Sequence, residues 1–176
     1  MSEKGSSESE KGSSESAQFP LIEVQLSTQT LRLISESGET VYPISSAKNG
    51  AGQESGSGCT PLGQHYIRAK IGQDVPLNTV FRGRRPTGEC YTPQLAENFP
   101  ERDWILTRIL WLSGRELGYN RLGKVDTMRR YIYIHGTPDS EPMGVPLSHG
   151  CIRMRNMDLV ELFDMTTVGT AVLILP

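Results

Sequence analysis

Short segments in which apolar and polar residues alternate make up most of the chain. Residues 21–26 read Leu-Ile-Glu-Val-Gln-Leu, and a polar Ser-Thr-Gln turn separates them from a similar run at residues 30–34. A period of two places the apolar side chains on one face of a strand, so these two runs predict a β-hairpin. The same reasoning predicts further strands at residues 40–44, 64–69, 79–81, 103–112, 131–134 and 170–175.

One segment near the end has helical spacing. Leu159, Leu162, Phe163 and Thr166 recur every three to four residues, and Asn156 precedes them as a fitting N-cap. The stretches at residues 45–63, 82–102 and 114–124 are rich in glycine, proline or polar residues and are expected to lack regular structure. Many strands and one clear late helix predict a mainly β domain that curves into a sandwich or barrel.

Residues 1–17 differ from the rest of the chain. Residues 2–8 read SEKGSSE and residues 9–15 repeat the same letters without an apolar side chain. Such a segment buries too little surface to offset the entropy lost on ordering, so we interpret it as a disordered tail, appended as a tag. Residues 18–176 then form one domain of ordinary size.

Charge and hydropathy weigh against two classes of partner. Removing the two lysines and four glutamates of the tail from 18 basic and 20 acidic residues leaves 16 of each, so the domain is formally neutral. Nucleic-acid-binding domains usually carry a basic excess, and no nucleic-acid partner is expected. No apolar run approaches the roughly 20 residues that span a bilayer, and no export signal is visible.

Residues 135–151 carry the candidate chemistry. The segment contains His135, His149 and Cys151, with Gly150 directly before the cysteine. A thiol is a poor nucleophile until a base takes its proton, and an imidazole brought near by a folded loop can do so. Successive N–H groups at a glycine turn can stabilise an oxyanion. A zinc site formed by the same three side chains is the alternative, although His-x-Cys is not a usual ligand spacing.

The amino-acid sequence around these residues resembles the signature of a known family. His135-Gly136-Thr137, followed by Ser148-His149-Gly150-Cys151-Ile152-Arg153-Met154, is similar to the signature of the L,D-transpeptidase (YkuD-like) family, and Thr60-Pro61-Leu62-Gly63 resembles another of its segments. The resemblance extends over residues 20–176. It implies an enzyme without a metal or organic cofactor that acts on peptidoglycan stem peptides and that carbapenems acylate.

The resemblance also implies roles for residues of the signature. Cys151 would be the nucleophile and His135 the general base, oriented by the carbonyl of Gly136. His149 would line the site, and the N–H groups of His149, Gly150 and Cys151 would bind the oxyanion.

Other residues near the motif receive weaker assignments. Ser148 and Thr137 are grouped with the substrate-binding residues, with Ser148 shaping the turn. Arg153 has two equal interpretations: it pairs with a substrate carboxylate, or with an acid of the protein such as Asp139. Arg82, Arg84 and Arg85 form a basic cluster that is better explained as a solvated charge run than as a binding site. His65 is expected to be structural, and Cys59 and Cys90 receive no chemistry.

The same motif serves enzymes that transfer the acyl group from the cysteine to an amine and enzymes that hydrolyse it with water, so the motif does not decide between them. We expect an L,D-carboxypeptidase that trims tetrapeptides to tripeptides in murein recycling in the cytoplasm, because no export signal is visible and the insert between Phe81 and Tyr131 resembles signal-less family members. Three cysteines, an odd number, also favour a reducing compartment. The alternatives are a periplasmic L,D-transpeptidase whose export signal the tail has replaced, and a non-catalytic peptide-binding module.

Overall fold

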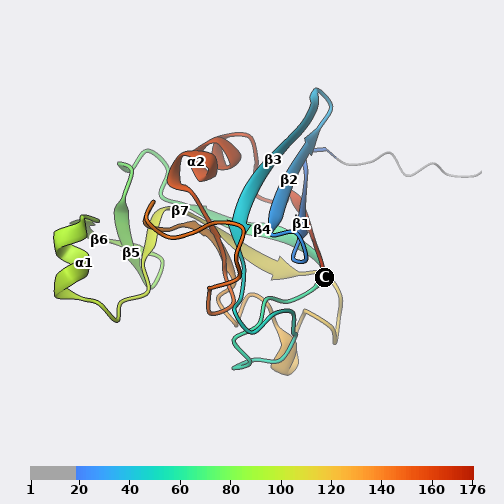
Figure 1. The fold of residues 1–176 in the computed structure, drawn as a ribbon. Helices are drawn as coiled ribbons and strands as arrows, with labels where there is room; N and C mark the ends of the chain where they lie inside the picture. Colours follow the sequence, from blue (N-terminus) through green and yellow to red (C-terminus); the bar gives the residue numbers. More distant parts are fainter. Residues whose placement is uncertain (1–18) are drawn as a thin grey trace, which may run out of the picture.

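The strands of the chain pair into one sheet that closes on itself. The computed structural model of the protein describes residues 19–176, so the tail predicted at residues 1–17 lies outside the described residues. Within the described part the strand order is β4-β10-β1-β2-β3-β9-β8-β7-β5-β6, and β4 also pairs with β7. That extra pairing closes the strands from β4 to β7 into a barrel, from which β5 and β6 extend (Figure 1).

The bounds of the elements agree in most places with the predicted segments. The structure contains β1 (Leu21–Gln25), β2 (Thr30–Ser35), β3 (Gly38–Ser45), β4 (Gly63–Ile71), β5 (Thr79–Arg82), β6 (Arg85–Cys90), α1 (Pro93–Asn98), β7 (Ile105–Gly114), the 3₁₀ turn η1 (Gly123–Val125), β8 (Tyr133–Gly136), β9 (Ile152–Met154), α2 (Asn156–Asp164) and β10 (Ala171–Leu175). The predicted mainly β class is confirmed.

Buried apolar side chains at alternate positions along the strands form the core of the barrel. Ile22 and Val24 of β1 lie opposite Leu33 and Leu31 of β2 in the antiparallel register, and all four side chains are buried. On the other side β1 pairs in parallel with β10, which contributes Val172 and Ile174 to the same core. Because one face of each strand is buried, a shift of register by one residue would expose the whole apolar set, and the pattern therefore fixes the pairing.

Helix α2 packs against β7 and β8 and completes this core with Leu159, Leu162 and Phe163. The prediction of Asn156 as its N-cap is wrong. Arg155 occupies the cap position without a side-chain cap bond, and Asn156 is the first helical residue. Its buried amide is used for tertiary contacts instead, and donates to the carbonyl oxygen of Thr137 at 2.9 Å. No helix among residues 19–176 is long and apolar enough to cross a membrane.

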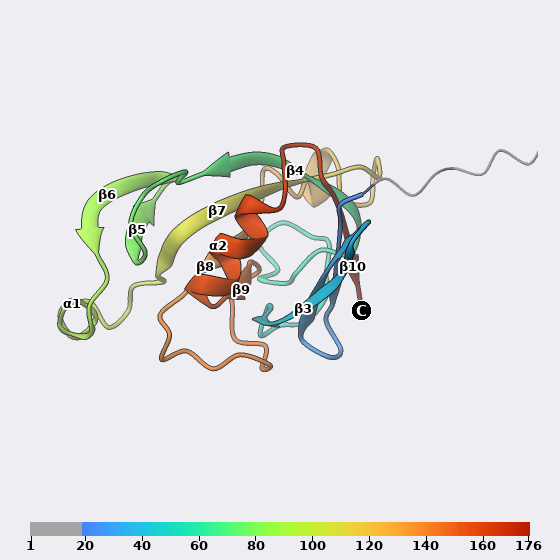
Figure 2. The same ribbon diagram turned by 90° about the horizontal axis from the view of Figure 1, so that it is seen from above.

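The prediction that residues 82–102 lack regular structure is also wrong. β6 pairs with β5 as a hairpin, and α1 follows with Pro93 in its first turn and the Thr92 hydroxyl accepting from the Leu95 amide at 3.1 Å. β6 and α1 project from the barrel (Figure 2) and contain no buried residue, so they show no apolar periodicity. Local capping and turn signals were therefore the only clues to these elements.

Candidate active site

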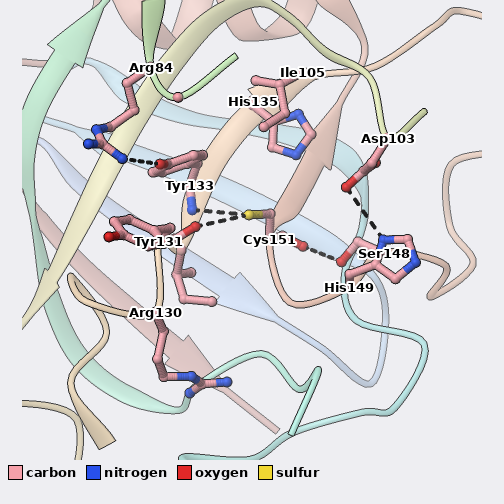
Figure 3. Close-up of a pocket in the computed structure, with 12 residues that line it drawn as sticks. Arg84, Asp103, Ile105, Arg130, Tyr131, Tyr133, His135, Ser148, His149 and Cys151 are labelled. Atoms are coloured by element: carbon pink, nitrogen blue, oxygen red, sulfur yellow. Dashed lines mark hydrogen bonds and ion pairs between the residues drawn. The ribbon is translucent and has the colours of Figure 1, made fainter. Parts of the chain in front are cut away.

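Two parallel strands bring the candidate chemistry to one place. β8 ends in His135 and Gly136, while Cys151 directly precedes β9, and His135 lies in register with Arg153 across the pair. The strand predicted at residues 131–134 begins at Tyr133 instead, because Tyr131 has a positive φ of 55° that interrupts the extended backbone. His135, His149 and Cys151 border one cavity of about 520 Å³. Figure 3 shows that cavity and the residues around it.

The turn before Cys151 is fixed by contacts with distant segments. The Ser148 amide donates to the Ser46 carbonyl at 2.8 Å, and the Ser148 hydroxyl donates to the Cys151 carbonyl. Thr60, which the sequence analysis noted only as part of a motif, donates its hydroxyl to the Gly150 carbonyl at 2.9 Å. Gly150 has a φ of 138°, where a side chain would be strained. These contacts hold the turn in one conformation.

The thiol of Cys151 is only partly exposed and contacts two backbone groups of neighbouring residues. It donates to the Tyr131 carbonyl at 3.4 Å, and the Tyr133 amide donates to the sulfur at 3.4 Å. Burial raises the pKa of the Cys151 thiol to about 12, although the Tyr133 amide opposes this shift. The resting residue is therefore a neutral thiol, and it needs a base at the moment of attack.

His135 has the properties of that base. It is almost fully buried, and its Nδ1 lies 2.7 Å from the Gly136 carbonyl oxygen, as the resemblance implied. A carbonyl only accepts, so Nδ1 carries the proton and Nε2 keeps its lone pair. Burial lowers the pKa of His135, so the imidazole is neutral near pH 7. Gly136 is required for packing, because a Cβ there would come within 2.5 Å of the Leu106 carbonyl oxygen.

An acidic residue outside the motif completes the site. Asp103, just before β7, accepts from Arg153 at 2.9 Å and lies 3.4 Å from Nδ1 of His149. Burial alone would raise the pKa of Asp103, but His135, Arg153 and His149 together lower it. Sequence reasoning missed Asp103 because nothing in its neighbourhood marks it. The expectation that Arg153 pairs with an acid of the protein is confirmed, but that acid is Asp103 and not Asp139, which accepts from Asn156 at 3.2 Å.

Arg130 was a second residue that sequence reasoning missed. It borders the cavity, and its guanidinium donates to the carbonyl oxygens of Gly52 and Gln53 at 3.0 Å each and of Cys59 at 2.6 Å. The predicted loop at residues 45–63 is thereby attached to the wall of the site. Arginine suits this position because its planar guanidinium carries several N–H donors and can bind several carbonyl oxygens at once.

The remaining predicted residues lie in different places. Thr137 is buried and borders a separate, smaller cavity of about 50 Å³ together with Asp103 and Arg153, so its role in substrate binding stays a prediction. Ser148 borders the cavity. Of the basic cluster, Arg84 alone borders the same cavity. Among residues 19–176 no three histidine, cysteine or acidic side chains converge as metal ligands, so His135, His149 and Cys151 do not form the alternative zinc site.

Comparison with known proteins decides the family. The profile of the YkuD family, the L,D-transpeptidase catalytic domain, matches residues 20–174. The chain belongs to the L,D-transpeptidase family. Members of this family act on peptidoglycan.

Two curated L,D-transpeptidases are similar over part of the chain. The probable L,D-transpeptidase YbiS of Escherichia coli is 46% identical over 107 residues, which cover 58% of this chain and 34% of that protein. The putative L,D-transpeptidase YqjB of Bacillus subtilis is 44% identical over 63 residues, which cover 36% of this chain and 34% of that protein. The chain thus spans about a third of the length of these relatives.

Solved L,D-transpeptidases share the fold. An L,D-transpeptidase from Mycobacterium smegmatis superposes with a TM-score of 0.51 at 16% identity, covering 89% of this chain and 58% of that one. The L,D-transpeptidase LdtMt1, solved in complex with imipenem, has a TM-score of 0.51 at 17% identity, covering 88% of this chain and 58% of the other. The barrel is therefore the L,D-transpeptidase fold.

Proposed function

We propose that this L,D-transpeptidase family member is a cysteine enzyme that cleaves the bond between the diamino acid and D-alanine of a stem tetrapeptide. The observation that carries the proposal is that the Cys151 thiol and the imidazole of His135, oriented by the Gly136 carbonyl, border the same cavity. A protonated thiol and a base with a free lone pair are the reactants that general-base-assisted attack requires.

In the first step the Cys151 sulfur attacks the carbonyl carbon at the L-centre of the diamino acid. Its proton passes to Nε2 of His135, and a sulfur–carbon bond forms. When the tetrahedral intermediate collapses, the carbon–nitrogen bond to D-alanine breaks, and the imidazolium returns the proton to the leaving amine. The product of this step is a thioester on Cys151 together with free D-alanine.

The turn before Cys151 supplies the donors for the negative oxygen of the intermediate. We assign this role to the amides of His149 and Cys151 first. The Gly150 amide already donates to the Ser148 hydroxyl at 3.3 Å, so an oxyanion would compete with that contact. Because Thr60 and Ser148 hold the turn before substrate arrives, the donors need little reorganisation during the reaction.

In the second step we propose that water attacks the thioester, which makes the enzyme an L,D-carboxypeptidase. His135 takes a proton from the water, the oxygen–carbon bond forms and the sulfur leaves with a proton. Cys59, Cys90 and Cys151 are all free thiols, which supports a reducing compartment such as the cytoplasm, where stem peptides are recycled rather than cross-linked.

Transfer to an amine is the second candidate, and one feature favours it. Another cavity of about 470 Å³ lies beside the first and shares Arg130, Tyr131, Ile132 and His149 with it. An acceptor peptide bound there would reach the thioester from the side opposite to the β5–β6 hairpin. The names of the curated relatives, both L,D-transpeptidases, favour the same outcome.

The experiment is a product analysis. The protein and its Cys151→Ala variant are incubated with L-Ala-γ-D-Glu-diaminopimelate-D-Ala in the presence of a D-amino acid, and products are identified by mass spectrometry. We expect tripeptide as the main product, formed only with Cys151 present. Exchange of the D-amino acid into the peptide would identify a transpeptidase instead. Binding of the peptide without any product would identify a non-catalytic module.

A further inference from the structure

The tip of the β5–β6 hairpin places one arginine over the cavity. Gly83 and Arg84 are the two residues between the paired Arg82 and Arg85, and both have positive φ, 54° and 64°. Glycine or asparagine normally occupies the second of these turn positions, so arginine there adopts an unfavourable backbone conformation. Its side chain must be held by contacts that compensate.

Three aromatic residues make those contacts. The Arg84 guanidinium lies 4.5 Å from the Trp111 ring centre and 5.1 Å from that of Tyr131, and it donates to the Tyr133 hydroxyl at 3.0 Å. Stacking on aromatic faces holds the planar group in place while leaving its edge free to donate hydrogen bonds. Figure 3 shows Arg84 and Asp103 on opposite sides of Cys151.

The other charges that border this cavity are already engaged. Arg130 donates to backbone carbonyls of the loop at residues 45–63, and Asp103 pairs with Arg153 and His149. Arg84 is different, because no carboxylate of residues 19–176 lies within ion-pair distance of it. The hydrogen bond to the Tyr133 hydroxyl uses one of its five N–H donors, and the others are available to a ligand.

We propose that Arg84 binds either the D-glutamate α-carboxylate or the free diaminopimelate carboxylate of the acyl-donor peptide, and thereby selects peptides that carry it free over peptides in which it is amidated. This inference rests on the proposed function. An arginine that is stacked and lacks a carboxylate partner recognises a planar anion by two parallel hydrogen bonds. An amide in the same position offers only one acceptor oxygen, no charge and an N–H group facing other donors.

The test combines three peptides with two variants. The peptides are the tetrapeptide with free carboxylates and two versions amidated singly, at the D-glutamate α-carboxylate or at the diaminopimelate carboxylate. The variants are Arg84→Gln and, as a matched control on the same hairpin, Arg85→Gln, whose exposed side chain does not border the cavity. Both are made in the active protein and in the Cys151→Ala background, and peptide affinity is measured by calorimetry in the latter.

With the free peptide, Arg84→Gln is expected to raise KM and weaken affinity by about tenfold or more, while kcat stays within about twofold. One amidated peptide should bind to the original protein and to Arg84→Gln equally weakly. The Arg85→Gln control should leave all values unchanged. Equal losses for all three peptides, or no loss for any, would overturn the inference.

The affinity measurements keep this inference separate from the proposed function. They need no turnover, so a tetrapeptide that binds through Arg84 but is never cleaved would support the inference and contradict the enzyme. Cleavage with no discrimination by Arg84 would do the reverse.

Discussion

Two regions of the barrel each contain a buried histidine, and they differ in one contact. In the region of β4, Nδ1 of His65 lies 2.9 Å from the Gly63 carbonyl oxygen, and Nε2 lies 2.9 Å from the Thr127 hydroxyl. In the region of β8, Nδ1 of His135 lies 2.7 Å from the Gly136 carbonyl oxygen, while Nε2 has no hydrogen-bond partner among residues 19–176 and the side chain borders the cavity. Each side chain is 1% exposed.

The partner of the second ring nitrogen distinguishes a structural histidine from a base in this fold. Burial favours the neutral imidazole in both regions, and a carbonyl fixes the tautomer in both. At His65 the second nitrogen is satisfied by the protein, so the residue contributes to packing only. At His135 the second nitrogen remains for the thiol proton. Neither burial nor a lowered pKa alone identifies the catalytic residue.

The largest expected effect comes from replacing each histidine with glutamine. His135→Gln should lower kcat/KM for the tetrapeptide by about 10³-fold, since general-base catalysis contributes on that order. Its melting temperature should change little. His65→Gln should instead lower the melting temperature and leave the activity of the folded protein near the original value. The same pattern of activity and thermal unfolding in both variants would show that the two histidines do not differ in role.

The second effect is a pH dependence of stability that depends on His65. Burial lowers its pKa from 6.5 to about 4, so between these values the unfolded chain binds a proton that the folded protein does not. Stability therefore falls as pH decreases through this window, by about 3 kcal/mol at most. Denaturant unfolding at several pH values would measure it. His65→Gln should flatten that slope, and an unchanged slope would contradict the account.

A smaller effect is expected from Thr127→Val, which removes the hydroxyl that satisfies His65. A buried ring nitrogen left without a partner costs about 1–3 kcal/mol of unfolding free energy. Thr127→Ser keeps the hydroxyl and should retain most of the stability. Tetrapeptide cleavage should be unaffected in both variants, because Thr127 lies outside the cavity with Cys151. A loss of activity at full stability would show that the His65 region takes part in catalysis.

The smallest effect is expected from Asp103→Asn. The Asp103 charge raises the pKa of His135 and pairs with Arg153. Without it the pKa of His135 falls further, so the acid limb of the kcat/KM profile should move to lower pH, and kcat should fall several-fold. Asp103→Glu should restore part of the original profile. An acid limb at the same pH in all three proteins would show that Asp103 does not influence the base.

The sequence predicted the parts of the fold and site that local patterns encode. Alternation in β1 and β2 predicted the hairpin, and the family resemblance implied that the Gly136 carbonyl orients His135, as the contact with Nδ1 confirms. The sequence did not predict the contact of Asp103 with Arg153 or that of Thr60 with the Gly150 carbonyl. These residues reach the site only through tertiary pairing between segments far apart in the chain. The aromatic contacts of Arg84 were missed because a charged residue in a turn usually faces solvent, and only the aromatic side chains beneath it distinguish it from its neighbours.

The most direct test of the central claim is a map of covalent acylation. The protein, Cys151→Ala and His135→Gln are incubated briefly with imipenem, digested, and analysed by peptide mass spectrometry. Opening of the β-lactam forms a sulfur–carbon bond, breaks the ring carbon–nitrogen bond and transfers the thiol proton to that nitrogen. We predict an adduct on Cys151 alone, absent in Cys151→Ala and formed much more slowly in His135→Gln. An adduct on Cys59 or Cys90 of comparable yield, or acylation at an equal rate without His135, would contradict the account.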